Sequence, residues 1–299
     1  MIDNCVLVSN GKGGVGKTAI TSSLSSLAAA SGWRVLMVDI DPQGNLEREF
    51  GYTDISDRGL SLLRSVRDAQ PLEVVASVRE NLDVVAGGEF TSQLAEWVVV
   101  QNLTGGVDPS PRIEASLERI AGHYDLIVID CPPGEAKLVD AFAAVAHYVV
   151  APTTGDAASL DGLARVMSAI IDARAAGNPH IELLGIVVTF IPAGASSLER
   201  EIRAELAETF PPNTKIFSPT IRYAKKAAID VRKRGIQPDE YEVLKDAAER
   251  EVPWYRTFKK TNVPRYSTAA TGLADDYQRL VTAILDAYST RQRELGHIG

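Results

Sequence analysis

The chain has 299 residues, 45% of them hydrophobic, and a formal net charge of −8 at pH 7. This length accommodates one large α/β domain or two small ones, with enough apolar residues for a sizeable core. The negative charge excludes a polycation, so any contact with nucleic acid must come from a local patch. No apolar run approaches the roughly 18 residues of a membrane span. Only two cysteines are present, far apart, which is typical of a reduced, cytoplasmic protein.

The first stretch of the chain predicts a strand, a glycine-rich loop and a helix in succession. Residues 5–9 are a short apolar run, and residues 19–31 have the pattern of a helix. The loop between them satisfies the G-x-x-x-x-G-K-[ST] phosphate-loop pattern in its required strand–loop–helix context. The candidate phosphate-binding residues are Gly11, Lys12, Gly13, Gly14, Val15, Gly16, Lys17 and Thr18.

The residue types of this loop suit an anion. Glycines let consecutive backbone N–H groups point at a phosphate, and the following helix adds the positive end of its dipole. We expect Lys17 to reach the β- and γ-phosphates and the Thr18 hydroxyl to ligate Mg²⁺. A plain glycine turn is the alternative interpretation. Lys12 is a second lysine within the loop that the pattern does not require.

The run 35–39 is apolar on both faces and ends in a carboxylate, as a buried parallel strand does at the carboxyl edge of its sheet. Asp39 and Asp41 are two residues apart, so on a strand they would share a face and approach one metal–phosphate centre. Pro42 and Gly44 then predict a loop. Carboxylates at this place can support Mg²⁺ or orient an attacking water. A solvated Asp-Pro turn is the alternative.

The next segment is less clear. Short helices are predicted over 60–66 and 72–78, and a strand over 81–85. Residues 90–100 are compatible with either helix or strand. Two glycines and two prolines over 104–111 predict a loop.

The second half of the chain alternates regularly. We predict helices over 111–121, 136–146, 160–176, 197–210 and 273–288, and strands over 126–130, 148–151, 183–189 and 215–217. The alternation predicts an α/β fold of the P-loop NTPase type, with a mostly parallel sheet and helices on both faces. Because no clean linker is present, we expect a single domain over 1–299.

Asp130 ends the clearest strand of the chain. Four apolar residues before it would anchor the strand, and its carboxylate would face the metal, as in a Walker B motif. A helix-capping or turn aspartate is the alternative. Pro132, Pro133 and Gly134 follow as a stiff segment with a hinge, which suits a switch ordered by nucleotide.

A basic cluster lies near the C-terminal third of the chain. Its cations are Arg222, Lys225, Lys226, Arg232, Lys233 and Arg234. Such a patch can neutralise DNA phosphates without reading bases, or it can be a solvated helix face. An acidic stretch over 239–251 is predicted to be helical. Three aromatics and three cations interleave over 254–260, where they could extend a DNA or partner surface or cover the core.

Three segments of the chain resemble the deviant Walker A ATPases, and specifically the ParA proteins, which segregate plasmids and chromosomes. These segments are Lys12–Thr18, Asp39–Gly44 and Tyr124–Pro133. They occur in the expected order, and the resemblance extends over residues 5–220 and again over 267–288. The second and third segments favour ParA over the related MinD proteins.

The resemblance implies an ATPase whose two subunits sandwich two ATP molecules with Mg²⁺. Lys12, Lys17 and Asp41 would be catalytic: Lys12 would cross to the phosphates of the partner subunit, and Asp41 would position the attacking water. Thr18, Asp39 and Asp130 would serve the metal. The adenine would lie near 189–192 and 219–221, with Thr189 and Pro219 as candidate contacts.

The same resemblance implies partners and a location. The ATP-bound homodimer would bind double-stranded DNA non-specifically through the basic cluster, and a centromere-bound ParB-type protein would stimulate hydrolysis. The protein would be cytoplasmic and nucleoid-associated. The chain departs from the family pattern in three ways. It is a short form without the N-terminal helix-turn-helix domain of longer relatives, it lacks the serine expected after Pro133, and residues 236–266 form an extra segment compared with compact members of the family.

Three other classes remain as alternatives. A MinD-like ATPase would need a basic, amphipathic C-terminal anchor, and the tail 289–299 has too little apolar surface for that, so no membrane partner is expected. An iron–sulfur relative would need paired cysteines, which Cys5 and Cys131 do not provide. A non-hydrolysing scaffold would position other cellular cargo, but Asp41 and Asp130 argue for hydrolysis. Cargo identity stays open, so a cargo-positioning ATPase that acts on a protein scaffold remains an alternative.

Overall fold

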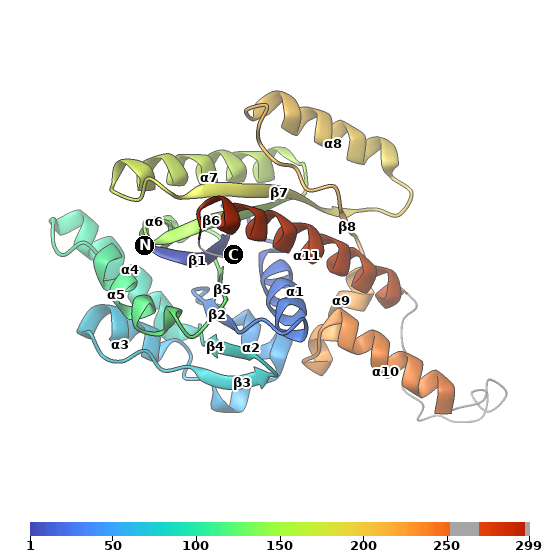
Figure 1. Cartoon of the computed structure of the whole chain (residues 1–299), viewed down its shortest axis with the longest axis horizontal. Coiled ribbons are helices and arrows are strands. Elements are labelled where there is room, and N and C mark those ends of the chain that lie inside the picture. The colour runs from blue at the N-terminus through green and yellow to red at the C-terminus, as the bar shows by residue number, and fades with distance from the viewer. Residues whose placement is uncertain (252–268, 297–299) are drawn as a thin grey trace.

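The computed structural model describes residues 1–251 and 269–296. Its centre is an eight-stranded sheet in the order β3-β4-β2-β5-β1-β6-β7-β8, in which only β3 pairs antiparallel to its neighbour (Figure 1). The strands are β1 Ile2–Val8, β2 Val35–Asp39, β3 Val75–Arg79, β4 Leu82–Val85, β5 Leu126–Asp130, β6 Ala146–Thr153, β7 Glu182–Ile191 and β8 Ile221–Arg222. Strands β2, β5 and β6 are buried along their whole length, because helices cover both faces of the sheet.

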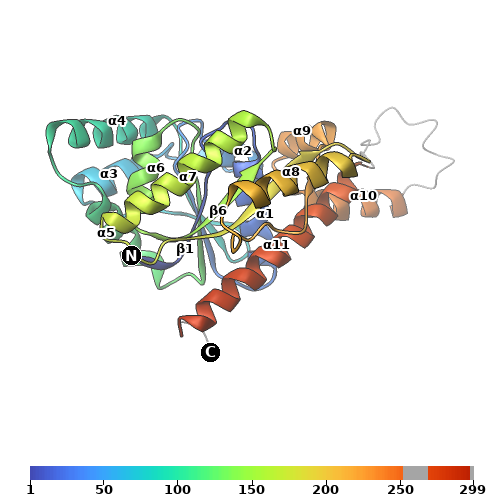
Figure 2. The same cartoon turned by 90° about the horizontal axis from the view of Figure 1, so that it is seen from above.

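Two helical layers enclose this sheet and form two hydrophobic cores. The helices are α1 Lys17–Ala30, α2 Asn45–Phe50, α3 Leu60–Asp68, α4 Glu89–Thr104, α5 Ser110–Ala121, α6 Ala136–Ala143, α7 Ala157–Ala175, α8 Ser196–Thr209, α9 Lys225–Arg234, α10 Pro238–Glu251 and α11 Ala269–Glu294. One core takes side chains from α3 to α8. The other takes them from α1, α2, α9 and α11. Figure 2 shows α4, α6 and α7 on one side of the sheet and α11 on the other. The predicted α/β architecture is therefore confirmed.

The strand register places the chemistry at one edge of the sheet. Val8 at the end of β1 and Asp39 at the end of β2 both pair with Asp130 at the end of β5. The carboxyl ends of these three parallel strands meet there. The phosphate loop, the Asp41 turn and the Pro132-Pro133 segment therefore emerge side by side.

Several local predictions are corrected by the structure. The predicted helix over 72–78 is wrong: Val75–Arg79 is strand β3, which returns antiparallel on β4 through a turn with Asn81 at φ 59°. The ambiguous segment 90–100 belongs to helix α4. The predicted strand 215–217 contributes only one bridge, from Ile216 to Ile186, and the strand after it is β8. Helix α2 has only six residues and was not predicted.

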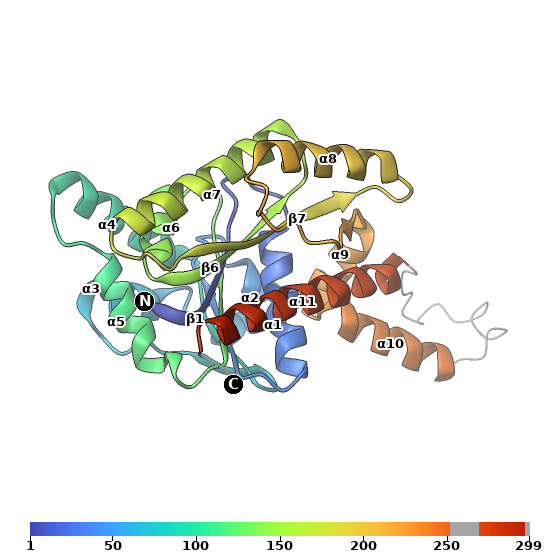
Figure 3. The same ribbon diagram turned by 45° about the horizontal axis from the view of Figure 1, so that its top comes forward.

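The extra segment 236–266 begins with α10, which packs beside α9 and α11 (Figure 3). The acidic stretch 239–251 is helical, as predicted. The aromatic and cationic run 254–260 lies outside the described residues. Within the described part of the chain, no helix is long and apolar enough to cross a membrane.

Candidate active site

The phosphate loop has the backbone that an anion site requires. Gly14 and Gly16 adopt φ of 75° and 95°, which favours glycine because a Cβ is strained there. Helix α1 begins at Lys17, and no side chain caps its first turn. The unpaired N–H groups of that turn therefore remain available to a phosphate, as at other helix N-termini that bind anions.

Lys17 is a buried cation at the centre of this loop. Its side chain amine donates to the Lys12 carbonyl oxygen at 2.8 Å, and the residue is 6% exposed. Burial lowers the pKa of Lys17, although the nearby Asp130 and Asp41 carboxylates oppose this. A buried ammonium with a neutral hydrogen-bond acceptor is well placed to bind an anionic oxygen.

Asp130 carries a buried carboxylate at the same edge of the sheet. Its side chain is fully buried, and its Oδ1 accepts a hydrogen bond from the Thr21 hydroxyl at 3.3 Å, with Thr18 close enough to lower the pKa of the carboxyl. Its Oδ2 atom is buried with no hydrogen-bond partner in the described part of the chain. Burial raises the pKa of Asp130 to about 7. An orphaned buried carboxylate oxygen beside a threonine hydroxyl is the oxygen-only donor set that Mg²⁺ prefers, so these residues fit the ion.

Asp39 and Asp41 do not share a face at this centre. Asp39 is fully buried; its Oδ1 accepts the Asp41 N–H at 2.9 Å and its Oδ2 accepts the Leu46 N–H at 3.4 Å. Burial and the Asp130 charge raise the pKa of Asp39 well above its usual value. Asp41 follows the end of β2 and lines the cleft, where its Oδ1 accepts the Gln43 N–H. Asp39 thus holds the turn that presents Asp41.

A cleft of about 770 Å³ opens beside the loop. The loop residues Gly13, Gly14, Gly16, Lys17 and Thr18 line one wall, together with Asp41 and Pro133. The opposite wall comes from β8, α9 and α11. A volume of this size accommodates a nucleotide-sized ligand.

Thr189 and Pro219, the two predicted adenine contacts, are not among the described residues that line the cleft. Thr189 is buried beneath the loop, where its hydroxyl donates to Val15 O and is 3.0 Å from Thr153 O. Thr189 therefore supports the loop from below. Pro219 is not among the described residues that line the cleft, whereas Phe190 and Tyr223 are, with ring centroids 6.4 Å apart. The two rings are nearly perpendicular, at 79°, so each offers a separate apolar face that a base could contact.

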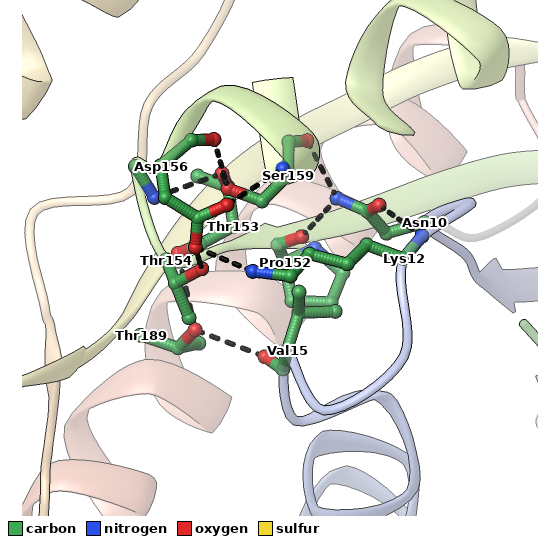
Figure 4. A network of polar contacts seen from close by, with 10 residues as sticks. Asn10, Lys12, Val15, Pro152, Thr153, Thr154, Asp156, Ser159 and Thr189 are labelled. Atoms are coloured by element: carbon green, nitrogen blue, oxygen red, sulfur yellow. Dashed lines mark hydrogen bonds and ion pairs between the residues drawn. The ribbon is translucent and has the colours of Figure 1, made fainter. Parts of the chain in front are cut away.

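The Lys12 side chain extends from the loop toward Asp156 and Thr154 (Figure 4), and Lys12 is not among the described residues that line the cleft. Its amine pairs with Asp156 Oδ2 at 2.5 Å, and Thr154 also donates to that oxygen. Asp156 is the N-cap of α7, and Asp156 Oδ1 accepts the Ser159 N–H. The Lys12 and Thr154 hydrogen bonds lower the pKa of Asp156 to about 2. The extra lysine is thus held within its own subunit by the start of α7.

Sequence reasoning missed Asp156 and Asn10. The Asn10 amide donates to Pro152 O at 2.7 Å and Ser159 O at 3.2 Å, which fastens the start of the loop to α7. Gly162 permits this approach, because a Cβ there would overlap the Asn10 side chain. An aspartate before a helical apolar pattern is a recognisable N-cap signal, but it does not reveal its long-range partner.

The six predicted DNA-binding cations fall into two sets. Arg222 forms a bidentate pair with the buried Asp276, and Arg232 pairs with Glu49 at 2.6 Å. Arg234 lies over the Tyr241 ring. The remaining three are Lys225, Lys226 and Lys233, which are exposed and have no ion-pair partner among the described residues.

The fold and this site define a P-loop ATPase, and comparisons with known proteins agree. A family model described as an AAA domain matches residues 3–183. The sporulation initiation inhibitor protein Soj of Bacillus subtilis is 32% identical over 191 residues, 63% of this chain and 73% of that relative. The chromosome-partitioning ATPase Soj of Thermus thermophilus is 32% identical over 205 residues, 69% of this chain and 76% of its own. The fold is shared with an ATP complex of an McdA variant from Cyanothece, with a TM-score of 0.68 at 18% identity, covering 92% of this chain and 96% of that one.

The family model matches more than half of the chain, and the chain covers more than two thirds of both Soj relatives. The chain therefore belongs to the ParA/MinD-type partition ATPases, and it is an ATP hydrolase with a P-loop fold.

Replacing Asp130 should stabilise the nucleotide-free protein at alkaline pH. The folded chain retains a proton on Asp130 up to about pH 7, whereas the unfolded chain releases it near 3.8. This group therefore lowers stability progressively as pH rises from about 4 to about 7. We expect Asp130→Asn to raise the melting temperature at pH 8 by at least about 2 °C, with a smaller gain at pH 5. The control is Asp125→Asn, which removes the ion-pair partner of Arg34 and should lower the melting temperature. An equal gain at both pH values would contradict the assignment.

Proposed function

We propose that this ATPase dimerises on binding ATP–Mg²⁺, binds DNA without sequence preference as the ATP dimer, and partitions plasmid or chromosomal DNA with a ParB-type partner. The observation that carries the proposal is that one cleft is bounded by both the phosphate loop and the basic helix α9. A nucleotide in that cleft would contact the element that carries the exposed lysines. The proposal places the protein in the cytoplasm, on the nucleoid.

Each site residue has a defined part in this proposal. The loop N–H groups and Lys17 would bind and orient the phosphates, and Thr18 and Asp130 would hold Mg²⁺, which neutralises phosphate charge when bound. Asp41, presented by Asp39, would orient the attacking water at the γ-phosphate. The Pro132-Pro133 segment would respond to the state of that phosphate, since Pro133 lines the cleft.

Lys12 supports the dimeric part of the proposal. Its amine lies against Asp156 and does not reach into its own phosphate site. A cation that extends outward from the loop is available to a second subunit. There it would stabilise the negative charge on the phosphoryl group during its transfer, as an arginine finger does. The Lys12–Asp156 ion pair would have to break before the Lys12 amine could reach the second subunit.

A cargo-positioning ATPase that acts on a protein scaffold is the second candidate. The observation that favours it is the internal pairing of Arg222 and Arg232, which leaves fewer cations for DNA than the sequence suggests. Exposed lysines on α9 nevertheless remain, and the binding test below separates the two candidates.

Nucleotide state should control DNA affinity. We expect tight binding of a mixed-sequence duplex with a slowly hydrolysed ATP analogue and weak binding with ADP or without nucleotide. Lys226→Ala and Lys233→Ala should each reduce the salt slope of binding by about 1, because each removes one phosphate contact. The control is Arg200→Ala on α8, which belongs to the helical layer on the other face of the sheet. Equal DNA affinity in all three nucleotide states would refute the gated model.

The two loop lysines should have separable effects. Lys12→Ala should largely retain ATP binding but lose dimerisation-linked hydrolysis, because its amine lies outside its own phosphate site. Lys17→Ala should impair nucleotide binding itself. Calorimetry and sedimentation measure the two steps separately. Full ATPase activity in a strictly monomeric Lys12→Ala protein would contradict the trans role.

Asp156→Asn should favour the dimer. Asparagine keeps the N-cap acceptor for Ser159 but removes the charge that holds Lys12. An exposed pair contributes up to about 1 kcal/mol and a symmetric dimer opens two of them, so the dimer dissociation constant with the ATP analogue should fall by up to about thirtyfold. Asp140→Asn, which breaks an exposed lysine pair on α6, is the matched control. A dimer that is unchanged or weaker in Asp156→Asn would show that the pair does not oppose the transfer.

A further inference from the structure

Arg232 differs from the other cations of α9 because its partner reaches back to the nucleotide site. Arg232 Nη2 donates to Glu49 Oε1 at 2.6 Å, and Glu49 Oε2 accepts the Ser22 hydroxyl at 2.8 Å. Glu49 lies on α2, and Ser22 lies on α1 one turn after Thr18, so one carboxylate joins three helices. Glu49 is only 8% exposed. The Arg232 side chain is 50% exposed, so the pair is shielded from water on the α2 side and open to it on the α9 side.

Helix α2 connects the cleft to the end of α9. Its first turn follows the loop that presents Asp41. At its other end, the Gln237 amide donates to the backbone oxygen of Glu49 at 3.2 Å. The backbones of Gly51 and Gly235 approach so closely that a Cβ on Gly235 would lie 3.2 Å from Gly51, and both glycines adopt positive φ. The C-terminal ends of α2 and α9 are thus fitted directly against each other.

Arg79 adds a second clamp at the same junction. Its guanidinium donates to Phe50 O at 3.2 Å and to Gly235 O at 2.9 Å, so it binds the ends of α2 and α9 together. It also pairs with Glu240 on α10 at 2.5 Å. With these contacts, a displacement of α2 is transmitted to α9 and cannot be absorbed by a loose loop between them.

We infer that the Glu49–Arg232 ion pair couples the nucleotide site to the basic surface of α9, and that Arg232 is a positioning residue and not a DNA contact. A change in the Asp41 turn on nucleotide binding moves α2, and Glu49 carries that movement to α9. The exposed Lys226 and Lys233 are then presented differently in each nucleotide state. The inference rests on the proposed function for its DNA step only, since the coupling between α2 and α9 needs no DNA.

Hydrogen exchange of the α9 amides tests the coupling without DNA. The wild-type protein and the Arg232→Ala, Arg232→Lys and Lys233→Ala variants are compared at saturating ADP and at saturating ATP analogue. We expect the wild type to show a nucleotide-dependent difference in α9, Arg232→Ala to lose it, and Arg232→Lys to retain part of it. Lys233→Ala is the matched control, because it removes a neighbouring exposed charge that has no ion-pair partner among the described residues, and it should keep the full difference.

DNA affinity measured on the same variants gives the second readout. Lys233→Ala should lower the ratio of the ATP-analogue affinity to the ADP affinity only by the loss of one phosphate contact, because Lys233 is presented to the duplex in the ATP state, and its intact α9 exchange distinguishes it from Arg232→Ala. Arg232→Ala should reduce that ratio by at least about fivefold, the lower end of ordinary coupling between sites. Glu49→Gln keeps an acceptor for Ser22 but removes the charge, and it should reduce the ratio without a further loss when combined with Arg232→Ala.

The outcomes separate this inference from the proposed function. If the wild type binds DNA equally with both nucleotides while α9 exchange still depends on nucleotide through Arg232, the proposed function fails and the coupling stands. If α9 exchange in the wild type ignores the nucleotide, or if Lys233→Ala abolishes the exchange difference as completely as Arg232→Ala does, the inference is overturned. A reduced melting temperature common to Arg232→Ala and Arg232→Lys, with the exchange difference intact in both, would also overturn it and leave Arg232 a structural residue.

Discussion

The register of β2 against β5 is the constraint on which the rest of the site depends, because it sets Asp39 opposite Asp130 at the ends of two fully buried strands. Two carboxylates removed from water oppose each other's ionisation, which is unfavourable for a fold with no ligand. The same edge holds the buried Lys17 ammonium and the uncapped N–H groups of α1. Buried carboxylates, a buried ammonium and uncapped N–H groups therefore lie together at one edge of the sheet. A phosphate-bearing ligand with a divalent cation satisfies them together, which is why perturbed groups concentrate at functional sites.

The division of labour between the two neighbouring aspartates follows from this register. Asp39 is the last residue of β2 and is enclosed by the backbone of Gly87 as well as by two N–H donors. Its carboxylate is committed to the turn, so only Asp41 is free to face the cleft. The alternation of side chains along a strand predicted that Asp39 and Asp41 lie on one face. The strand ends at Asp39, however, and the chain turns there. Spacing alone therefore placed two carboxylates at a cleft that Asp41 lines and Asp39 does not.

What the sequence could predict was local. The strands 35–39 and 126–130 were correctly placed because a strand buried on both faces is a continuous apolar run, and the phosphate loop has a fixed spacing. Segment 72–78 was misjudged because its short apolar pattern suits helix and strand alike, and pairing with β4 decided it. The partners of Lys12 and Arg232 are 144 and 183 residues away in the chain. No local pattern specifies such pairs, so the cations of α9 looked equivalent until the fold distinguished them.

In the proposed function, an acidic protein binds DNA through the exposed cations of helix α9. With a net charge of −8, the chain as a whole repels a polyanion, so its exposed cations must be concentrated and correctly oriented to overcome that repulsion. Helix α9 carries these cations and also forms a wall of the nucleotide cleft, which Lys225 itself lines. Its orientation is set by Glu49 on one side and by the core contacts of Ala227 and Val231 on the other. In the proposed function, a small rotation within those limits would redistribute few charges, but against a repulsive background those few would determine whether a duplex is bound.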